Sequence, residues 1–258
     1  MGNLANMAGL KVRPATCPTA EGGRWQIRPY RGGVVVADVV IPVADDATHA
    51  ARVTTFQNAV REHAGRTEGR LAIVRQFITT GMPVGLIPEA YYHLRSEVAA
   101  YCKVHPSAVV VVGSCRTGFS IAKKEFRPRY RPFNEESDID VAVVSAPMFD
   151  TIWDTVFASQ SSPDWVLSAI GAKRGRGEYP HHLARDLFNG CIVPERLNAI
   201  RPTSVAADWV AEFDRITRTR AYGKLGVRGR LYRSWSRLES YQGIMVTECN
   251  AALSSQPK

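Results

Sequence analysis

Long hydrophobic runs are missing from this sequence of 258 residues. A membrane-spanning helix needs about 20 consecutive, mainly apolar residues, whereas the longest apolar runs here are residues 34–41 and 108–112. Residues 1–23 also lack the apolar stretch of a signal peptide. These absences exclude a membrane helix and predict a cytoplasmic protein with no membrane partner.

Cysteine is scarce and scattered. The five cysteines are odd in number and never lie in a C-x-x-C spacing: Cys17, Cys102, Cys115, Cys191 and Cys249. Disulfide frameworks and structural zinc sites need paired or regularly spaced cysteines, so the pattern argues against both and suits a reducing compartment. Cys115 is expected to be a small packed residue rather than a reactive thiolate.

Acidic residues are in deficit, because 24 Asp and Glu stand against 33 Lys and Arg, for a net charge of +9. Such a balance favours polyanionic partners. Residues 215–237 hold eight basic residues and no acidic one, and Tyr222, Tyr232 and Trp235 lie among them. Because arginine binds phosphate and aromatic rings stack on bases, this tract is a candidate nucleic-acid path. A solvated basic face with its aromatic residues in the core is the equally weighted alternative.

The hydrophobic pattern predicts an α/β (α+β) protein in three parts. We expect a poorly ordered N-terminus at residues 1–23, an α/β core at residues 24–194 and a helical region at residues 195–258. Residues 34–41 are β-branched and end before Pro42, which predicts a strand. Apolar residues at helical spacing predict helices over residues 53–60 and after Pro88, Ser145 and Ser204.

The last long helix is expected from about residue 228 to residue 251. Its inward-facing residues would be Leu231, Trp235, Leu238 and Met245. Arg230, Arg233 and Arg237 would share another face, because residues three and four positions apart are neighbours on a helix. These three arginines are the candidate nucleic-acid-binding residues.

Two buried strands are predicted at the centre of the sequence. Residues 108–112 (AVVVV) are too apolar for a half-exposed strand, and the run ends at Gly113 and Ser114. The second strand is predicted at residues 139–144 (IDVAVV). Because side chains alternate along a strand, Asp138 and Asp140 would share one face while Ile139 enters the core on the other.

The paired carboxylates indicate a metal site. Two carboxylates this close repel each other, and one tends to hold a proton. Mg²⁺ or Mn²⁺ relieves the conflict, because hard cations bind carboxylate oxygens. Two such ions about 4 Å apart can clamp a triphosphate and activate an attacking hydroxyl. Asp138 and Asp140 are therefore the predicted catalytic and metal-binding residues.

The turn after the first strand is the predicted phosphate-binding element. Gly113 lets the backbone approach a phosphate closely, and the following N–H groups and the Ser114 hydroxyl can hold the anion. Ser120 is expected to shape the next segment and, with Lys123 and Lys124, completes the candidate nucleotide-binding set. Arg127, Arg129 and Arg131 could contact a triphosphate or an acceptor strand, and a solvated basic loop is the alternative.

The segments VVVVGS, GFS and SDIDVAVV resemble the signature of the polymerase-β-like nucleotidyltransferase superfamily. The resemblance covers roughly residues 84–160. It implies a mixed sheet with flanking helices, nucleoside triphosphate binding, two-metal catalysis and pyrophosphate release. By position, Gly113 and Ser114 would hold the β- and γ-phosphates, and Asp138 and Asp140 would bind the metals.

The sequence departs from this family in two places. The spacer at residues 115–137 is longer than in compact members, and we predict a loop beside the active site. The family also places a third carboxylate on a later strand, where this sequence has no hydrophobic-carboxylate-hydrophobic pattern. Glu178, Asp186 and Glu195 remain without an assignment.

The leading functional hypothesis is transfer of a nucleoside monophosphate to a nucleic-acid end, or template-free oligonucleotide synthesis. Single transferases of this size resemble those of prokaryotic antiviral and toxin–antitoxin systems, which is an analogy. Transfer to a protein side chain (AMPylation) or to a small hydroxylated compound is a second enzyme hypothesis. A catalytically inactive nucleotide or nucleic-acid sensor is the third, and a regulatory protein partner is left open.

Overall fold

The computed structural model describes residues 45–123, 126–159, 185–200 and 204–255 of the chain. The predicted disordered N-terminus, the predicted strand at residues 34–41, Lys124 and Glu178 lie outside these ranges. All described residues belong to one compact unit, residues 35–258. None of the described helices is long and apolar enough to cross a membrane.

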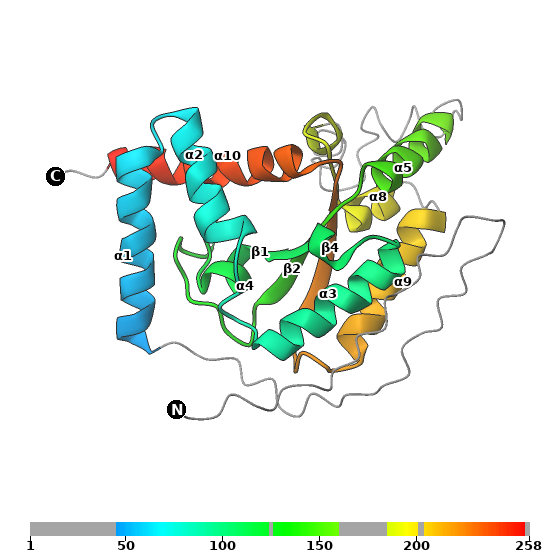
Figure 1. The fold of residues 1–258 in the computed structure, drawn as a ribbon, viewed down its shortest axis with the longest axis horizontal. Coiled ribbons are helices and arrows are strands. Elements are labelled where there is room, and N and C mark those ends of the chain that lie inside the picture. Colours follow the sequence, from blue (N-terminus) through cyan, green and yellow to red (C-terminus); the bar gives the residue numbers. More distant parts are fainter. Residues whose placement is uncertain (1–44, 124–125, 160–184, 201–203, 256–258) are drawn as a thin grey trace, which may run out of the picture. The chain divides into compact units, whose positions relative to one another are not determined.

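The described elements follow one another in a mixed order (Figure 1). They are α1 (Asp46–His63), α2 (Thr67–Val74), the π-helical turn η1 (Arg75–Thr79), α3 (Pro88–Cys102), the 3-10 turn η2 (Pro106–Ala108), β1 (Val109–Val112), α4 (Gly113–Thr117), β2 (Asp138–Val144), α5 (Ala146–Ser159), β3 (Cys191–Ile192), α8 (Pro194–Ile200), α9 (Ser204–Arg218), β4 (Gly226–Tyr232) and α10 (Trp235–Ser254).

The strands form one four-stranded mixed sheet in the order β1-β2-β4-β3. β1 is antiparallel to β2, β2 is parallel to β4, and β3 is antiparallel to β4. The α/β fold class is therefore confirmed, as are the two strands predicted at the centre of the sequence.

Helices cover both faces of the sheet (Figure 1). Residues of α3, α5, α8 and α9 form one hydrophobic core with alternate strand residues such as Val111, Val141 and Leu231. Residues of α1, α2 and α10 form a second core with the intervening strand residues, including Val110 and Ala142. Because the sheet is buried on both sides, all four residues of β1 are apolar and buried.

The predicted helix starts rest on local capping. The Asp45 side chain accepts a hydrogen bond from the Thr48 N–H at 2.8 Å, at the start of α1. Pro88 occupies the first turn of α3, where its missing N–H costs nothing. The Ser145 hydroxyl accepts from the Met148 N–H at 3.3 Å, before α5. α3 and α5 begin where the sequence predicts them, whereas α1 contains the predicted helical segment at residues 53–60 but begins earlier, at Asp46.

The predicted helix from about residue 228 is wrong at its N-terminal end, because Gly226–Tyr232 form β4 and α10 begins at Trp235. The two-residue alternation of the segment decides its structure: Val227 and Leu231 enter one core, while Arg228 and Arg230 point to the other face. Ser234 caps α10, and Trp235 at its first position is 41% exposed rather than buried.

The last strand of the chain lies inside the sheet rather than at its edge. β4 pairs with β2 on one side and with β3 on the other. The boundary predicted between residues 194 and 195 therefore crosses one continuous sheet, and residues 195–258 are not purely helical.

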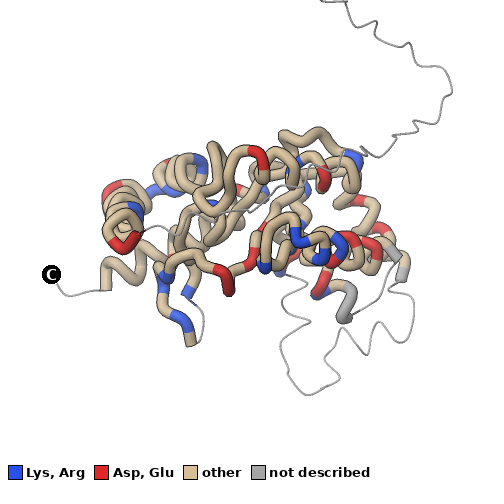
Figure 2. The backbone as a smooth tube through the Cα atoms, turned by 90° about the horizontal axis from the view of Figure 1, so that it is seen from below, with Lys and Arg blue, Asp and Glu red and all other residues tan. Residues whose placement is uncertain are grey.

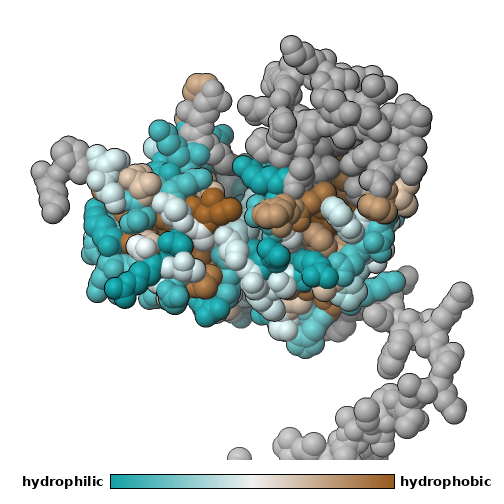
Figure 3. Space-filling model, turned by 90° about the horizontal axis from the view of Figure 1, so that it is seen from above, coloured by the Kyte–Doolittle hydropathy of each residue, from teal (hydrophilic) through white to brown (hydrophobic). Residues whose placement is uncertain are grey.

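Large hydrophobic side chains also reach the surface. On α5 and in the segment before β3 these are Trp153, Phe157 and Phe188. Figure 3 shows hydrophobic atoms at the surface of one face, among mostly hydrophilic side chains. Trp153, Phe157 and Phe188 do not line the pocket around Asp138 and Asp140.

Candidate functional site

The turn after β1 brings the chain against Asp140 of the neighbouring strand. Val112, the last residue of β1, pairs with Asp140, and Gly113 follows with φ +68°. A Cβ atom at position 113 would lie 2.6 Å from Asp140 Oδ2. Glycine is required here twice over, for its left-handed backbone and for the space beside the carboxylate.

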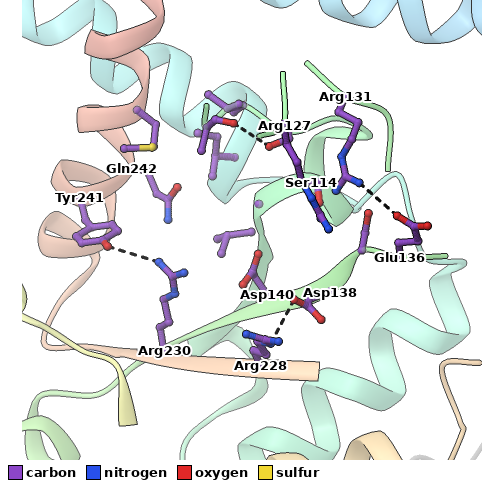
Figure 4. A pocket seen from close by; sticks show the side chains of 18 residues that line it. Ser114, Arg127, Arg131, Glu136, Asp138, Asp140, Arg228, Arg230, Tyr241 and Gln242 are labelled. Atoms are coloured by element: carbon purple, nitrogen blue, oxygen red, sulfur yellow. Dashed lines mark hydrogen bonds and ion pairs between the residues drawn. The ribbon is translucent and has the colours of Figure 1, made fainter. Parts of the chain in front are cut away.

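Asp138 and Asp140 project from the same face of β2, as the sequence predicts (Figure 4). The side chain of Asp138 is 39% exposed, and its Oδ2 lies 3.2 Å from Nε of Arg228. Gly226, opposite Asp138 on β4, leaves space for this carboxylate, because a Cβ there would lie 2.8 Å from Oδ1.

β4 contributes two arginines to the same face. Arg228 pairs with Asp140 in the sheet register, and Arg230 pairs with Ala142. Burial lowers the pKa of Arg230, but Asp140, Tyr232, Tyr241 and Cys191 together outweigh that effect, so the pKa is raised overall. Arg230 also donates a hydrogen bond of 3.5 Å to the Tyr241 hydroxyl on α10. The two aspartates thus lie beside the positively charged guanidinium groups of Arg228 and Arg230.

The spacer between the turn and β2 folds back on itself beside the site. Backbone hydrogen bonds join Ser120 to Arg131 at 2.8 Å and Phe133 to Gly118 at 2.9 Å. Arg127 from this segment extends toward Ser114, and Arg131 points to Glu136, with which it forms an ion pair at 3.8 Å (Figure 4). Arg129 does not line the pocket and donates to the Ile121 carbonyl at 2.7 Å.

These segments enclose a pocket of about 270 Å³. Of the predicted site residues, six line it: Gly113, Ser114, Ser120, Asp138, Asp140 and Arg230. Arg127 and Arg131, which the sequence analysis left as alternatives, also line the pocket. Arg228 and Gln242 line it as well, although the sequence predicted no role in the site for either. The Ser120 hydroxyl already donates to the Ala122 carbonyl at 3.1 Å, so this residue shapes the wall.

Three predicted binding residues lie away from the pocket. Lys123 is exposed and does not line it. Arg233 forms an ion pair with Asp150 of α5 at 2.8 Å, and the Arg237 side chain packs beside Gly190. The shared helical face predicted for Arg230, Arg233 and Arg237 is therefore wrong, because a strand, a connection and a helix carry them.

The strand that runs beside β2 supplies no third carboxylate. β4 is the strand that runs parallel to β2, and Arg228 is the residue opposite Asp140. Asp186 pairs instead with Arg196 at 2.7 Å. Glu195, in the first turn of α8, has its pKa raised by burial and lies within electrostatic range of Arg230, Arg228 and Asp140. Within the described ranges, no three acidic, histidine or cysteine side chains form a metal-binding group.

The acidic pair nevertheless fits a magnesium ion that arrives with a substrate. Mg²⁺ is usually held by one or two carboxylates together with substrate phosphates, and it keeps several waters. Asp138 and Asp140 offer hard oxygen donors on one face of one strand, at a pocket that also holds basic side chains able to bind phosphate. The residues present are therefore sufficient for one ion shared with a polyphosphate.

Cys115 lies directly behind the turn and is fully buried. Burial and, to a smaller extent, the charge of Asp140 raise the pKa of its thiol to about 12. The thiolate is therefore scarce at neutral pH, as the packed interpretation of this residue requires.

Tyr241 and Gln242 of α10 are pocket residues that the sequence reasoning missed. The sequence prediction began the last helix near residue 228 and counted Leu231 and Trp235 among its inward-facing residues. That choice placed the buried side of the helix elsewhere and hid the inward position of Gln242. The alternation of Val227, Gly229 and Leu231 with two arginines was the pattern that could have located β4, and with it the wall of the pocket.

The chain was compared with protein-family models, with curated proteins and with solved structures. None of the three comparisons found a match.

Proposed function

We propose that this chain is a magnesium-dependent nucleotidyltransferase, which transfers a nucleoside monophosphate from a nucleoside triphosphate to a hydroxyl group and releases pyrophosphate. The proposal rests on one observation: the glycine-serine turn, the two aspartates and four arginines line a single pocket of about 270 Å³. That arrangement combines hard oxygen donors for a cation with guanidinium groups for phosphate oxygens.

The reaction forms one bond and breaks one. The acceptor hydroxyl oxygen attacks the α-phosphorus, the bond from that phosphorus to the oxygen bridging the β-phosphate breaks, and pyrophosphate departs with the bridging oxygen. The hydroxyl proton passes to solvent. Bound Mg²⁺ would neutralise phosphate charge and orient the displaced group.

The protein residues have separate parts in this scheme. Asp138 and Asp140 would hold the ion, while the backbone after Gly113 and the Ser114 hydroxyl would donate to the terminal phosphates. Arg228, which pairs with Asp138 when no substrate is bound, would exchange part of that contact for a phosphate oxygen. Fixed donors of this kind stabilise charge as it develops on the leaving group.

A nucleic-acid end is the acceptor that the charge of the pocket favours. Arg127 and Arg131 lie on the side of the pocket opposite β4, where Arg131 is paired with the exposed Glu136 at 3.8 Å (Figure 4). Nε of Arg131 is buried without a hydrogen-bond partner in the free protein. An anionic acceptor satisfies these groups, whereas a cationic small molecule is repelled by them.

The test is nucleotide incorporation by purified protein with Mg²⁺ or Mn²⁺, each labelled ribo- or deoxyribonucleoside triphosphate and an RNA or DNA acceptor. We expect labelled, extended nucleic acid on a denaturing gel. Asp138→Asn with Asp140→Asn should lower the rate by at least about 100-fold, because the ion loses its protein ligands.

The matched control is Asp150→Asn, which removes an aspartate that pairs with Arg233 outside the pocket. It should keep wild-type incorporation. Equal losses in both variants, or full activity in the double variant, would contradict the proposal. Label on a protein band alone would move the acceptor to a protein side chain.

Nucleotide binding without turnover is the second candidate function. The observation that favours it is that β4, the strand beside β2, places Arg228 opposite Asp140 and carries no third carboxylate. Under this alternative, Mg²⁺ and a nucleoside triphosphate bind with measurable heat in calorimetry, while no acceptor is labelled under any condition.

A further inference from the structure

One wall of the pocket differs in chemistry from the phosphate-binding side. Ile78, Val112, Ile121 and Met245 line it with apolar atoms, and Gln242 is the amide among them. Apolar surfaces that leave one hydrogen-bonding side chain at an edge are suited to a flat aromatic ring with a polar rim. A nucleobase has that character, and the phosphates of the same nucleotide would reach the aspartates.

Gln242 is buried and has unused hydrogen-bonding capacity. Its side chain lies on the inner face of α10 and is 9% exposed. Its amide end points from α10 toward the interior of the pocket (Figure 4), and no protein hydrogen bond engages it among the described residues. This amide is not among the buried polar atoms that lack a partner, so solvent in the pocket reaches it. A ligand that enters the pocket can replace that solvent as its hydrogen-bond partner.

The neighbouring guanidinium is already engaged. Arg230 lies between α10 and the aspartates, where it donates to the Tyr241 hydroxyl and interacts with the charge of Asp140. Arginine is the usual reader of guanine, through O6 and N7, whereas glutamine pairs with adenine, accepting from N6 and donating to N7. The side chain on this wall that remains available to recognise a base is therefore the amide of Gln242.

We infer that Gln242 recognises the base of the bound nucleotide and selects adenine. This inference rests on the proposed function, since it names the nucleotide that the same pocket takes. Oε1 accepts a hydrogen bond from the adenine N6 amino group, and Nε2 donates to N7. The side chain of Met245, one turn further along α10, packs against the ring.

The test is calorimetric binding of the four ribonucleoside triphosphates and of inorganic triphosphate, each with Mg²⁺, to the full chain. We expect ATP to bind roughly tenfold or more tightly than the other three, as one bidentate amide contact supplies. Gln242→Leu should abolish that preference, and Gln242→Glu should do the same, because a carboxylate cannot donate to N7.

Two controls separate base recognition from folding and charge. Asn250→Asp introduces the same amide-to-acid change on α10 at a position that does not line the pocket, and it should keep the ATP preference. Inorganic triphosphate should bind the wild type and Gln242→Leu, which adds no charge to the pocket, equally, and this result would show that the phosphate side is intact.

The outcomes distinguish this inference from the proposed function. Equal binding of all four nucleotides, a preference for another base, or an ATP preference that survives in Gln242→Leu would overturn the role of Gln242 and leave triphosphate binding standing. Failure of every nucleotide and of inorganic triphosphate to bind would overturn both.

Discussion

At the scale of the residue, Gly113 is the position on which the site geometry depends most directly. Its φ of +68° lies in the left-handed region, and its missing Cβ leaves the space that Asp140 Oδ2 occupies. A side chain here would displace the carboxylate as well as strain the backbone.

Gly223 is a natural control for this effect. Its φ is +67°, but a Cβ at that position would meet no atom within 4 Å. We expect Gly113→Ala and Gly223→Ala each to lose about 1–2 kcal/mol of unfolding free energy from the backbone. Gly113→Ala alone should also lower nucleotide transfer by roughly 100-fold, because the carboxylate moves.

Chemical denaturation and incorporation assays on both variants check this prediction. Wild-type transfer in Gly113→Ala would show that the position of Asp140 tolerates the displacement. A comparable loss of transfer in Gly223→Ala would show that general destabilisation, rather than the carboxylate, sets the rate.

At the scale of the element, β4 is joined to α9 by a close approach at Gly229. A Cβ there would lie 2.3 Å from Cζ of Phe213, whose ring stacks on Trp209 with centroids 5.0 Å apart. Both aromatic side chains are buried. The absence of a side chain at position 229 therefore sets the distance between the helix and the strand.

Gly229→Ala should lower the free energy of unfolding by about 1–3 kcal/mol through overpacking. Phe213→Leu removes the ring atoms that the new methyl group would meet. In urea denaturation, the double variant should be less destabilised than the sum of the two single variants. Strict additivity would show that α9 shifts freely and that the contact does not fix it.

The elements that the sequence predicted correctly are those whose own residues carry a strong strand or helix pattern. β1 is continuously apolar, and Pro88 marks the first turn of α3. β4 was missed because its two glycines and its arginines weaken the strand signal and leave a two-residue alternation as its main local cue. What makes it a strand is the vacant hydrogen-bonding edge of β2, a tertiary contact that a single sequence does not display.

At the scale of the whole molecule, the basic residues that the structure describes do not form one continuous stripe. Figure 2 shows Lys and Arg on many separate segments, interspersed with Asp and Glu. Many exposed arginines are paired locally, as in the Arg75–Glu239 ion pair at 2.8 Å. The net charge of +9 therefore overstates what is concentrated at the pocket.

Nucleic-acid binding should accordingly depend on few phosphate contacts. We expect the logarithm of the affinity for single-stranded RNA to fall with the logarithm of salt concentration, with a slope that Arg127→Ala combined with Arg131→Ala reduces by about one to two. Arg233→Ala, which removes a partner of Asp150, should leave the slope unchanged. Fluorescence anisotropy across a salt series measures both, and a larger effect of Arg233→Ala would relocate the binding surface.

The sequence predicted the glycine-serine turn and the two aspartates of the site, but not the residues that α10 and β4 contribute to the pocket. Gly113, Ser114, Asp138 and Asp140 were predicted from motifs in one segment and do line one pocket. Arg228, Tyr241 and Gln242 come from the other end of the chain, and their inclusion depends on the pairing of β4 with β2. Parallel pairing of distant segments leaves no local pattern, so this half of the pocket required the structure.

The sheet order β1-β2-β4-β3 has a consequence for how the protein folds during its synthesis on the ribosome. β4, which fills the gap between β2 and β3, follows both of them in the sequence, so the sheet closes only after β4 has emerged from the ribosome. Until then Asp138 and Asp140 lack the arginines beside them, and a nascent chain that ends before β4 has no complete pocket. Synthesis itself would thus delay any activity of this site until β4 has been translated.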